Sequence, residues 1–221
     1  AAIIQHNTSG IISLKDSGIT SPKKMEGHSY ATWDMPIEQA IIKKVVTDDG
    51  GDYSKINLIS TSVEDIKAAL SSNINSVWIY YAWDGIACEL QGLDTNFFYF
   101  KDYSPELDDY SPVIIANNDF LKNNSEVAKK FMAALSKGYD YAIENPDDAA
   151  QILVDANEGL DIELCKKSQN WLASQYKADA DKWGVIDQKR WDAFYGWVYD
   201  NGLCEIDIPD GFGFSNAYLP E

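Results

Sequence analysis

The spacing of hydrophobic and polar positions changes near residue 116, and this change divides the chain into two kinds of sequence. Before that point, short apolar runs alternate with helical patterns. Strands are expected at residues 1–4, 11–14, 27–31, 53–59, 73–80, 96–100 and 112–116, and helices at 36–48, 64–70 and 84–90. This alternation predicts a parallel or mixed α/β sheet.

After residue 116 the pattern is almost entirely helical. Helices are expected at residues 125–145, 147–156, 161–176 and 187–201, followed by an aromatic-rich tail at 209–221. A helical half of this length normally packs on a sheet, and hardly any strands remain to form one. Either these helices form their own bundle, or the sheet that they cover belongs to sequence absent from this chain.

The stretch from Val77 to Gly85, V-W-I-Y-Y-A-W-D-G, combines a predicted buried strand with polar and aromatic residues at its exit. Val77 to Tyr80 are β-forming residues in a row, as in a strand buried on both faces. Tyr81, Trp83 and Asp84 follow where open α/β sheets bind ligands, and they suit a flat, hydrogen-bonding ligand. The alternative is that the aromatics are core residues and that Asp84 caps the next helix.

Charge and residue usage exclude several classes of function. The chain of 221 residues carries 18 basic and 35 acidic residues, a net charge of −17 that repels nucleic acids and anionic membranes. Its three cysteines, Cys88, Cys165 and Cys204, form no C-x-x-C pair, and His6 and His28 are its only histidines. We therefore expect no disulfide framework, no metal site and no catalytic triad.

The beginning of the chain is unlike that of a primary translation product. It starts Ala-Ala-Ile-Ile without methionine, shows no signal peptide, and has no run long enough to span a membrane. A processed or truncated protein begins in this way.

Five stretches occur in an order that resembles one protein family. They are W-D-M-P-I-E at 33–38, A-W-D-G-I at 82–86, D-D-Y-S-P-V-I-I at 108–115, K-G-Y-D-Y-A-I-E-N-P-D-D-A-A at 137–150 and F-S-N-A-Y-L-P at 214–220. Together they resemble solute-binding proteins of ABC importers, in the branch for pyrimidine precursors of thiamine, which is similar to the pyrimidine synthases of thiamine biosynthesis. The resemblance runs over essentially the whole chain.

The resemblance implies the type II periplasmic-binding-protein fold, with two α/β lobes joined by crossover strands. Residues 1–20 would be the first crossover, 21–107 a complete lobe, 108–116 the return crossover, and 117–221 the mainly helical part of the other lobe. Members begin with a signal peptide and a lobe of roughly ninety residues, so the first lobe would be incomplete here. An incomplete lobe exposes apolar surface, and we expect dimerisation, strand exchange or a rearranged C-terminal half.

Trp33, Trp83 and Asp84 are the strongest candidates for ligand contact. Trp33 offers a stacking plane before a helix that starts at Pro36, and its alternative role is to anchor the loop in the core. An aminopyrimidine presents a ring nitrogen and an amine along one edge, and a carboxylate such as that of Asp84 can accept the hydrogen bond of the amine while Trp83 stacks. The family often carries Glu where Asp84 stands.

Tyr81 and Tyr110 complete the predicted ligand-binding set. Tyr80 and Tyr81 alternate faces, and we favour Tyr81 as the one that faces a cleft. Tyr110, beside the return crossover, would close the cleft from the hinge. In contrast, Glu38 is expected to complement the helix dipole.

The expected function is binding rather than catalysis, with no catalytic residue and no cofactor. The partners would be a small pyrimidine-like molecule and an ABC permease, and the location extracytoplasmic, either periplasmic or lipid-anchored as a lipoprotein. Two alternatives remain: an iron-dependent pyrimidine synthase, whose C-C-C-x-C motif this chain lacks, and a sensory or interaction module that reuses the fold.

Overall fold

The computed structural model describes residues 1–221 and shows two compact units. The sheet unit comprises Thr8–Asp108 and Phe194–Asp207, and the helical unit comprises Ala1–Asn7, Asp109–Ala193 and Ile208–Glu221. Each unit is assembled from segments that are far apart in the sequence, so each depends on long-range contacts. Helix α8 (Gln188–Asp200) contributes its first part to the helical unit and its second part to the sheet unit.

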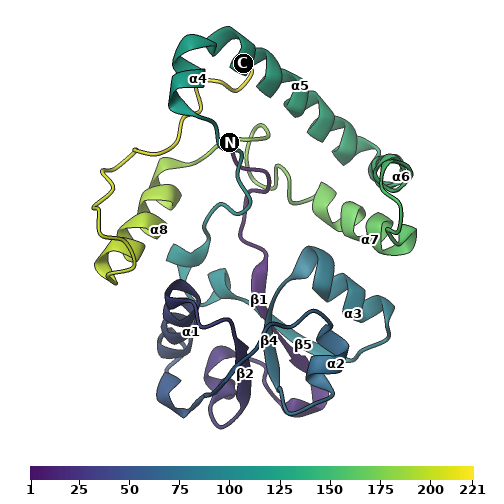
Figure 1. Ribbon diagram of the computed structural model, residues 1–221, viewed down its shortest axis with the longest axis vertical. Helices are drawn as coiled ribbons and strands as arrows, with labels where there is room; N and C mark the ends of the chain where they lie inside the picture. The colour runs from purple at the N-terminus through teal and green to yellow at the C-terminus, as the bar shows by residue number, and fades with distance from the viewer. The chain divides into compact units, whose positions relative to one another are not determined.

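The sheet unit is built on a five-stranded mixed sheet in the order β3-β2-β4-β1-β5 (Figure 1). The strands are β1 (Ser9–Leu14), β2 (Ser29–Thr32), β3 (Asn57–Ser60), β4 (Ser76–Tyr80) and β5 (Thr95–Tyr99). Strand β2 is parallel to β3 and β4, whereas β1 is antiparallel to both β4 and β5. It follows that β2, β3, β4 and β5 all end at the same edge, and only β1 begins there.

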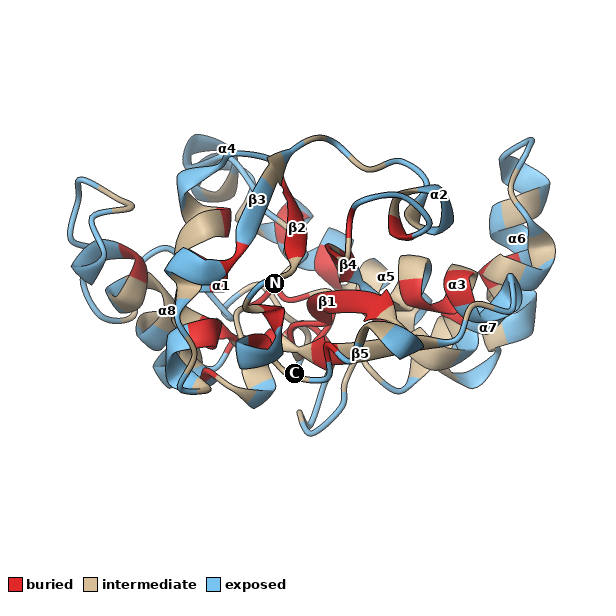
Figure 2. Cartoon of the chain, turned by 90° about the horizontal axis from the view of Figure 1, so that it is seen from below, coloured by how far each residue is buried: buried red, intermediate tan, exposed pale blue.

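Each face of this sheet is covered by helices, which explains why its central strands are apolar. Helix α1 (Pro36–Asp48) packs Ile42, Val45 and Val46 against Tyr30 and Ile11 on one face. Helices α2 (Ile66–Leu70) and α3 (Ile86–Leu90) cover the opposite face. The buried colour in Figure 2 accordingly lies on β1, β2 and β4, while β3 is largely exposed at the edge.

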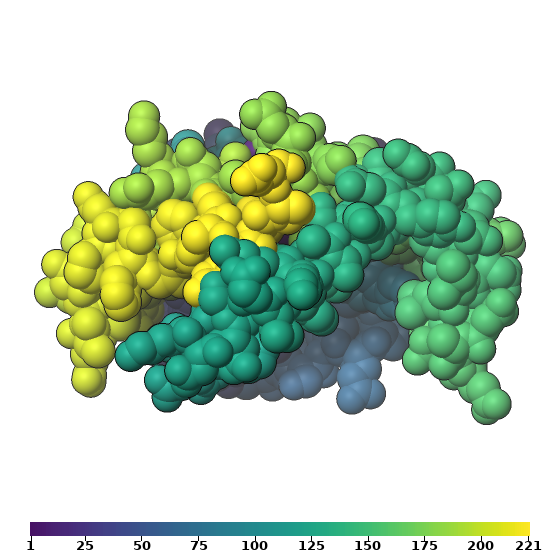
Figure 3. All heavy atoms as spheres, turned by 90° about the horizontal axis from the view of Figure 1, so that it is seen from above, coloured from purple at the N-terminus to yellow at the C-terminus, as the bar shows by residue number.

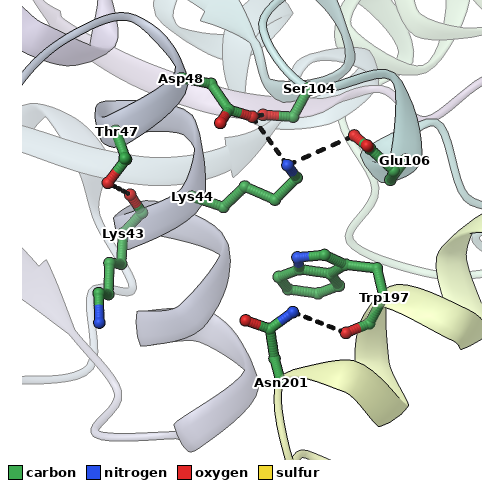
Figure 4. A network of polar contacts seen from close by, with 8 residues as sticks. All are labelled: Lys43, Lys44, Thr47, Asp48, Ser104, Glu106, Trp197 and Asn201. Carbon is green, nitrogen blue, oxygen red and sulfur yellow. Dashed lines mark hydrogen bonds and ion pairs between the residues drawn. The ribbon is translucent and has the colours of Figure 1, made fainter.

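A polar network fastens the end of α1 to the segment after β5 (Figure 4). Lys44 donates to Asp48 at 2.8 Å and lies 3.5 Å from a carboxylate oxygen of Glu106, and Ser104 donates to Asp48 at 2.6 Å. Burial raises the pKa of Asp48, but the hydrogen bonds from Lys44 and Ser104 outweigh it and hold that pKa below its ordinary value. Trp197, from the second part of α8, packs beside this network in the α1 core.

Several expected elements of the sheet unit start later than the sequence pattern indicates. Strand β3 begins at Asn57, because Tyr53–Lys55 forms a 3-10 turn in which the amide of Ser54 donates to the side chain of Asp52. Helix α2 begins at Ile66 rather than at residue 64, because Asp65 caps it by accepting from Ala68 N at 2.9 Å. Helix α1 runs from Pro36 to Asp48, as its apolar spacing predicts.

The helical unit contains α4 (Asn118–Asn123), α5 (Ser125–Glu144), α6 (Pro146–Ala156), α7 (Ile162–Ala173) and the first part of α8. Its main core is centred on Trp183, whose ring stacks on Tyr139 at 4.2 Å and whose indole nitrogen donates to Ile3 O at 3.0 Å. Asn117 caps α4 by accepting from Phe120 N.

The predicted strand at residues 112–116 does not join a sheet. It forms one isolated antiparallel bridge, between Ala2 and Val113, flanked by bonds from Ile3 N to Pro112 O and from Ile114 N to Ala1 O. The other edge of the first residues is occupied by loops, since Ala2 N donates to Gly184 O and Gln5 N to Gln175 O.

Helix α5, which lies in the teal part of Figure 3, carries exposed apolar residues on the side away from its packed face. Ala128, Met132 and Ser136 are buried on the packed face. On the exposed side, Val127, Phe131 and Tyr141 are 56%, 58% and 46% exposed at helical spacing. These side chains form a group of exposed apolar residues on one side of α5.

No helix of the protein combines the length and the apolar character that a bilayer crossing requires.

The packing of β1 against β5 can be tested at Gly10. This residue lies inside β1, although the sequence pattern places it just before the strand expected at 11–14. A Cβ at Gly10 would lie 2.0 Å from Phe98 O and 2.7 Å from Phe97 Cζ, so β5 must move away to accommodate it. We expect Gly10→Ala to lower the free energy of unfolding by about 1–3 kcal/mol or more, measured by urea denaturation. The control, Gly196→Ala on α8, meets nothing within 4 Å and should raise stability by up to about 1 kcal/mol. Equal effects of the two substitutions would contradict the packing described for Gly10.

Candidate functional site

The loop between β2 and α1 is organised by the side chain of Glu38. This carboxylate is buried, 1% exposed, and accepts hydrogen bonds from Tyr30 Oη at 2.5 Å and Thr32 Oγ1 at 2.9 Å. It also accepts from the backbone amides of Trp33, at 3.0 Å, and Met35, at 3.4 Å. Burial, together with the hydrogen bond to Glu38, raises the pKa of Tyr30 far above its ordinary range. The expected role of Glu38, as a charge near the helix N-terminus, holds only in part, because its main partners lie in β2 and the loop.

Trp33 is the first residue of this loop after β2. Its indole is 44% exposed, and its ring centroid lies 5.4 Å from that of Trp78 on β4. Trp78 in turn meets the edge of Phe100 at 4.5 Å. The next residue, Asp34, has a φ of 59°, a left-handed conformation that a residue with a Cβ adopts at some cost. Such strain is concentrated at functional sites.

A wide turn joins β4 to α3 and carries the other predicted residues of this edge. Tyr81–Gly85 forms a π-helical turn, and α3 begins at Ile86. π-type turns are rare and are frequent at functional sites. Gly85 is required by packing, because a Cβ there would lie 2.6 Å from the ring of Tyr81. Its backbone is helical, with φ −60° and ψ −48°, so glycine is needed there for space and not for an unusual backbone conformation.

Tyr81 packs on the aromatic side chains of β5. Its ring lies 5.1 Å from Phe97 and 6.1 Å from Tyr99, and its hydroxyl donates to Glu89. Lys101 lies 5.1 Å above the ring of Tyr99. Tyr80, the residue before, is 43% exposed. The orientation of Tyr81 towards a ligand thus stays a prediction.

Asp84 and Trp83 form the most chemically distinctive pair of the turn. Burial raises the pKa of Asp84, and a hydrogen bond from the backbone of Tyr80 offsets part of this effect. No cationic side chain pairs with Asp84, and it does not cap α3, whose N-cap residue is Gly85. The Trp83 indole is 42% exposed beside it. A desolvated carboxylate next to exposed aromatic surface suits a ligand that donates hydrogen bonds.

The structure brings four of the five predicted residues to one edge of the sheet unit. Trp33 follows β2, and Tyr81, Trp83 and Asp84 follow β4, a parallel neighbour of β2. These are carboxyl ends of parallel strands, the position where open α/β sheets bind ligands. No group of three or more His, Cys, Asp or Glu side chains with the arrangement of a metal site is present.

Tyr110, the fifth predicted residue, belongs to the helical unit. It is 7% exposed in a small core with Ala2 and Ile186. Its hydroxyl accepts from Asp187 N at 2.9 Å, and the guanidinium of Arg190 lies 5.0 Å above its ring. These contacts anchor Tyr110 within its own unit, and its role in ligand binding stays a prediction.

Sequence reasoning overlooked the contribution of Glu38, Trp78 and Phe100 to this edge. The capping position of Glu38 was visible in W-D-M-P-I-E, but its partners Tyr30 and Thr32 are set by the fold. Trp78 and Phe100 were assigned to strands without a partner, and only the register of β4, β1 and β5 brings them together.

Comparison with known proteins gives a consistent family assignment. A family model described as NMT1/THI5 like matches residues 1–149. The formylaminopyrimidine-binding protein of Halalkalibacterium halodurans is 26% identical over 222 residues, which cover 98% of this chain and 67% of that protein. The chain thus spans about two thirds of the length of this relative.

Solved structures with the same fold include binding proteins and an enzyme. The periplasmic aliphatic sulphonate-binding protein SsuA from Escherichia coli superposes with a TM-score of 0.64 and 13% identity, covering 91% of this chain and 67% of SsuA. The desulfurization enzyme DSZB has a TM-score of 0.57 and 10% identity, covering 99% of this chain and 75% of the enzyme. The fold is therefore the mixed α/β fold of periplasmic binding proteins, and the matched family model shows that the chain belongs to the NMT1/THI5-like family.

Proposed function

We propose that this protein is the solute-binding component of an ABC importer and that its ligand is a small aminopyrimidine-like precursor of thiamine. The observation that carries the proposal is Asp84, a partly desolvated carboxylate without a cationic partner, beside the exposed indole of Trp83. Membership of the NMT1/THI5-like family and similarity to a protein named for formylaminopyrimidine binding support the same ligand class.

The charge of this edge favours an amine-bearing ligand over a sulfonate. Fold neighbours include sulfonate-binding proteins, whose ligands are anions. A sulfonate near Asp84 would meet a like charge in a partly desolvated place, and this is unfavourable. An aminopyrimidine instead donates a hydrogen bond from its amine and can share a proton between its ring nitrogen and the carboxylate. The raised pKa of Asp84 favours this sharing.

Aromatic surface would supply the remaining affinity. Trp33 and Trp83 are each more than 40% exposed, although burial of large aromatics is normally favourable. A flat heterocycle that stacks on such indoles removes apolar area from water on both partners. Tyr81 and Tyr110 remain further predicted contacts.

The mechanism that we propose is hinge closure. The chain passes between its two units at residues 7–8, 108–109, 193–194 and 207–208, and the first two of these points lie within the predicted crossovers at 1–20 and 108–116. In hinge-closing proteins a few such residues absorb the backbone change, and a ligand shifts the population towards the closed state by its higher affinity for it. A permease that recognises the closed form would then receive the solute, at an extracytoplasmic location. A lipid anchor and self-association of the chain stay predictions.

Catalysis is the main competing function, since the fold also supports the enzyme DSZB. No observation in the sheet unit favours the iron-dependent synthase over binding, and a sensory module would use the same ligand site. Binding without chemical conversion of the pyrimidine distinguishes the proposed function from the synthase.

Ligand binding is tested by thermal shift and calorimetry with the hydroxymethyl-, aminomethyl- and formylamino- forms of the thiamine aminopyrimidine, and with an alkanesulfonate for comparison. We expect a pyrimidine to raise the melting temperature and the sulfonate to have no effect, because a ligand that binds the folded state stabilises it. Trp83→Ala and Asp84→Asn should each weaken pyrimidine binding by about tenfold or more. Phe212→Ala removes an exposed aromatic of the helical unit and should leave affinity unchanged. A response to sulfonate alone would refute the ligand class.

The ionised carboxylate of Asp84 should also lower the free energy of unfolding, and the size of this effect should depend on pH. Its folded-state pKa is raised above the ordinary value of 3.8, so the folded state holds the proton more tightly than the unfolded state. The resulting penalty is absent below pH 3.8 and grows as pH rises through the folded-state pKa. Asp84→Asn should therefore be more stable than wild type at pH 7, with the difference shrinking towards zero as the pH falls to 3.8.

The control for this pH dependence is Asp94→Asn, which changes an exposed carboxylate of the same unit. Urea denaturation between pH 4 and pH 8 measures both differences. A difference for Asp84→Asn that is independent of pH would show that Asp84 is not destabilised by desolvation.

A further inference from the structure

The Trp33–Met35 loop has its three backbone amides bound by two side chains, and this sets it apart from an ordinary loop. Glu38 accepts from Trp33 N at 3.0 Å and from Met35 N at 3.4 Å. The amide between them, Asp34 N, donates to Thr32 Oγ1 at 3.0 Å, and Thr32 Oγ1 donates to Glu38 at 2.9 Å. One carboxylate thus fixes the whole loop, directly at two residues and through Thr32 at the third.

Glu38 has no capacity left for a ligand. One of its oxygens accepts from Tyr30 Oη and, at 3.3 Å, from Trp33 N, and the other accepts from Thr32, Trp33 and Met35. The side chain is 1% exposed and has no ion-pair partner in the fold. Its charge is compensated by these donors and by the N-terminus of α1, both of which favour an anion.

The loop conformation that Glu38 holds is not one that the chain adopts freely. Asp34 has a φ of 59°, and a residue with a Cβ in this region is held there by its surroundings. Without the carboxylate, the amides of Trp33 and Met35 would be left without acceptors and Asp34 would relax towards negative φ. Either change re-aims Trp33, whose indole is 44% exposed and lies 5.4 Å from Trp78.

We propose that Glu38 is the positioning residue for Trp33: it never touches the solute, but it sets the plane of the indole on which the solute stacks. The inference rests on the proposed function for its effect on affinity, and on the loop geometry alone for its effect on Trp33. A preformed stacking plane raises affinity, because the loop does not have to be ordered when the ligand binds.

The decisive experiment is a double-mutant cycle on Glu38→Gln and Trp33→Ala, with Kd measured by calorimetry for the pyrimidine that binds wild type most tightly. In Glu38→Gln, an NH₂ group, which donates, replaces one of the two accepting oxygens. Trp33 N contacts both oxygens of Glu38, so the NH₂ group faces this amide in either orientation of the side chain. Each single variant is expected to weaken binding by on the order of tenfold. The double variant should bind no more weakly than Trp33→Ala, because Glu38 acts through Trp33. Additive losses would overturn the proposal.

Tyr30→Phe separates positioning from stability. It removes one hydrogen bond to Glu38 and leaves the bonds to Trp33 and Met35 in place. We expect this variant to melt at a lower temperature with unchanged Kd, whereas a purely structural role for Glu38 would make affinity fall in both Tyr30→Phe and Glu38→Gln. Glu205→Gln, at an exposed position of the sheet unit, controls for the loss of one charge.

A measurement without ligand keeps this inference separate from the proposed function. The fluorescence of Trp33 is obtained as the difference between each protein and its Trp33→Phe counterpart, and acrylamide quenching reports its accessibility. Quenching of Trp33 should increase in Glu38→Gln and remain unchanged in Tyr30→Phe. If no pyrimidine binds wild type, the proposed function fails and quenching still decides the positioning role. Unchanged quenching in Glu38→Gln would refute it.

Discussion

The buried carboxylate of Glu38 connects the sheet, the first helix and the loop between them. It binds Tyr30 and Thr32 of β2 and the amides of Trp33 and Met35, and its own backbone lies in the first turn of α1. A buried charge without a cation is costly unless every lone pair is occupied, so this arrangement tolerates little variation. The path of the chain out of β2 is therefore fixed by polar contacts, whereas apolar packing fixes α1 along the rest of its length.

The antiparallel strand β1, which lies between β4 and β5, determines which strands end at the edge of the candidate site. Because β4 and β5 both run opposite to β1, their carboxyl ends emerge at the same edge as that of β2. The aromatics of β5 thereby support Tyr81 after β4, and Phe100 supports Trp78. This close pairing depends on Gly10, where the backbone of β5 passes too near for any side chain. The close packing at Gly10 and the candidate binding surface thus depend on the same strands.

Local sequence signals predicted the elements whose causes are local. The apolar spacing after Pro36 gave α1 its bounds, and the β-forming run before Tyr81 gave β4. Elements that depend on distant partners were less predictable. The segment at 112–116 has strand composition, yet it forms only one bridge, between Val113 and Ala2. The amide of Ala2 donates to the loop at Gly184 instead of to a further strand. Glu38 likewise looked like a helix-terminal charge, because its hydrogen-bond donors are defined by the fold.

The π-helical turn at Tyr81–Gly85 has a consequence for how relatives of this protein diverge. A π-helical turn holds an extra residue compared with an α-helical one. Loss of one residue there would restore ordinary helical geometry, and α3 could keep its packing against the sheet. The side chains of the turn would nevertheless rotate, and Asp84 with them. An insertion or deletion, rather than a substitution, can therefore re-aim Asp84, a candidate ligand contact, while the scaffold is inherited intact.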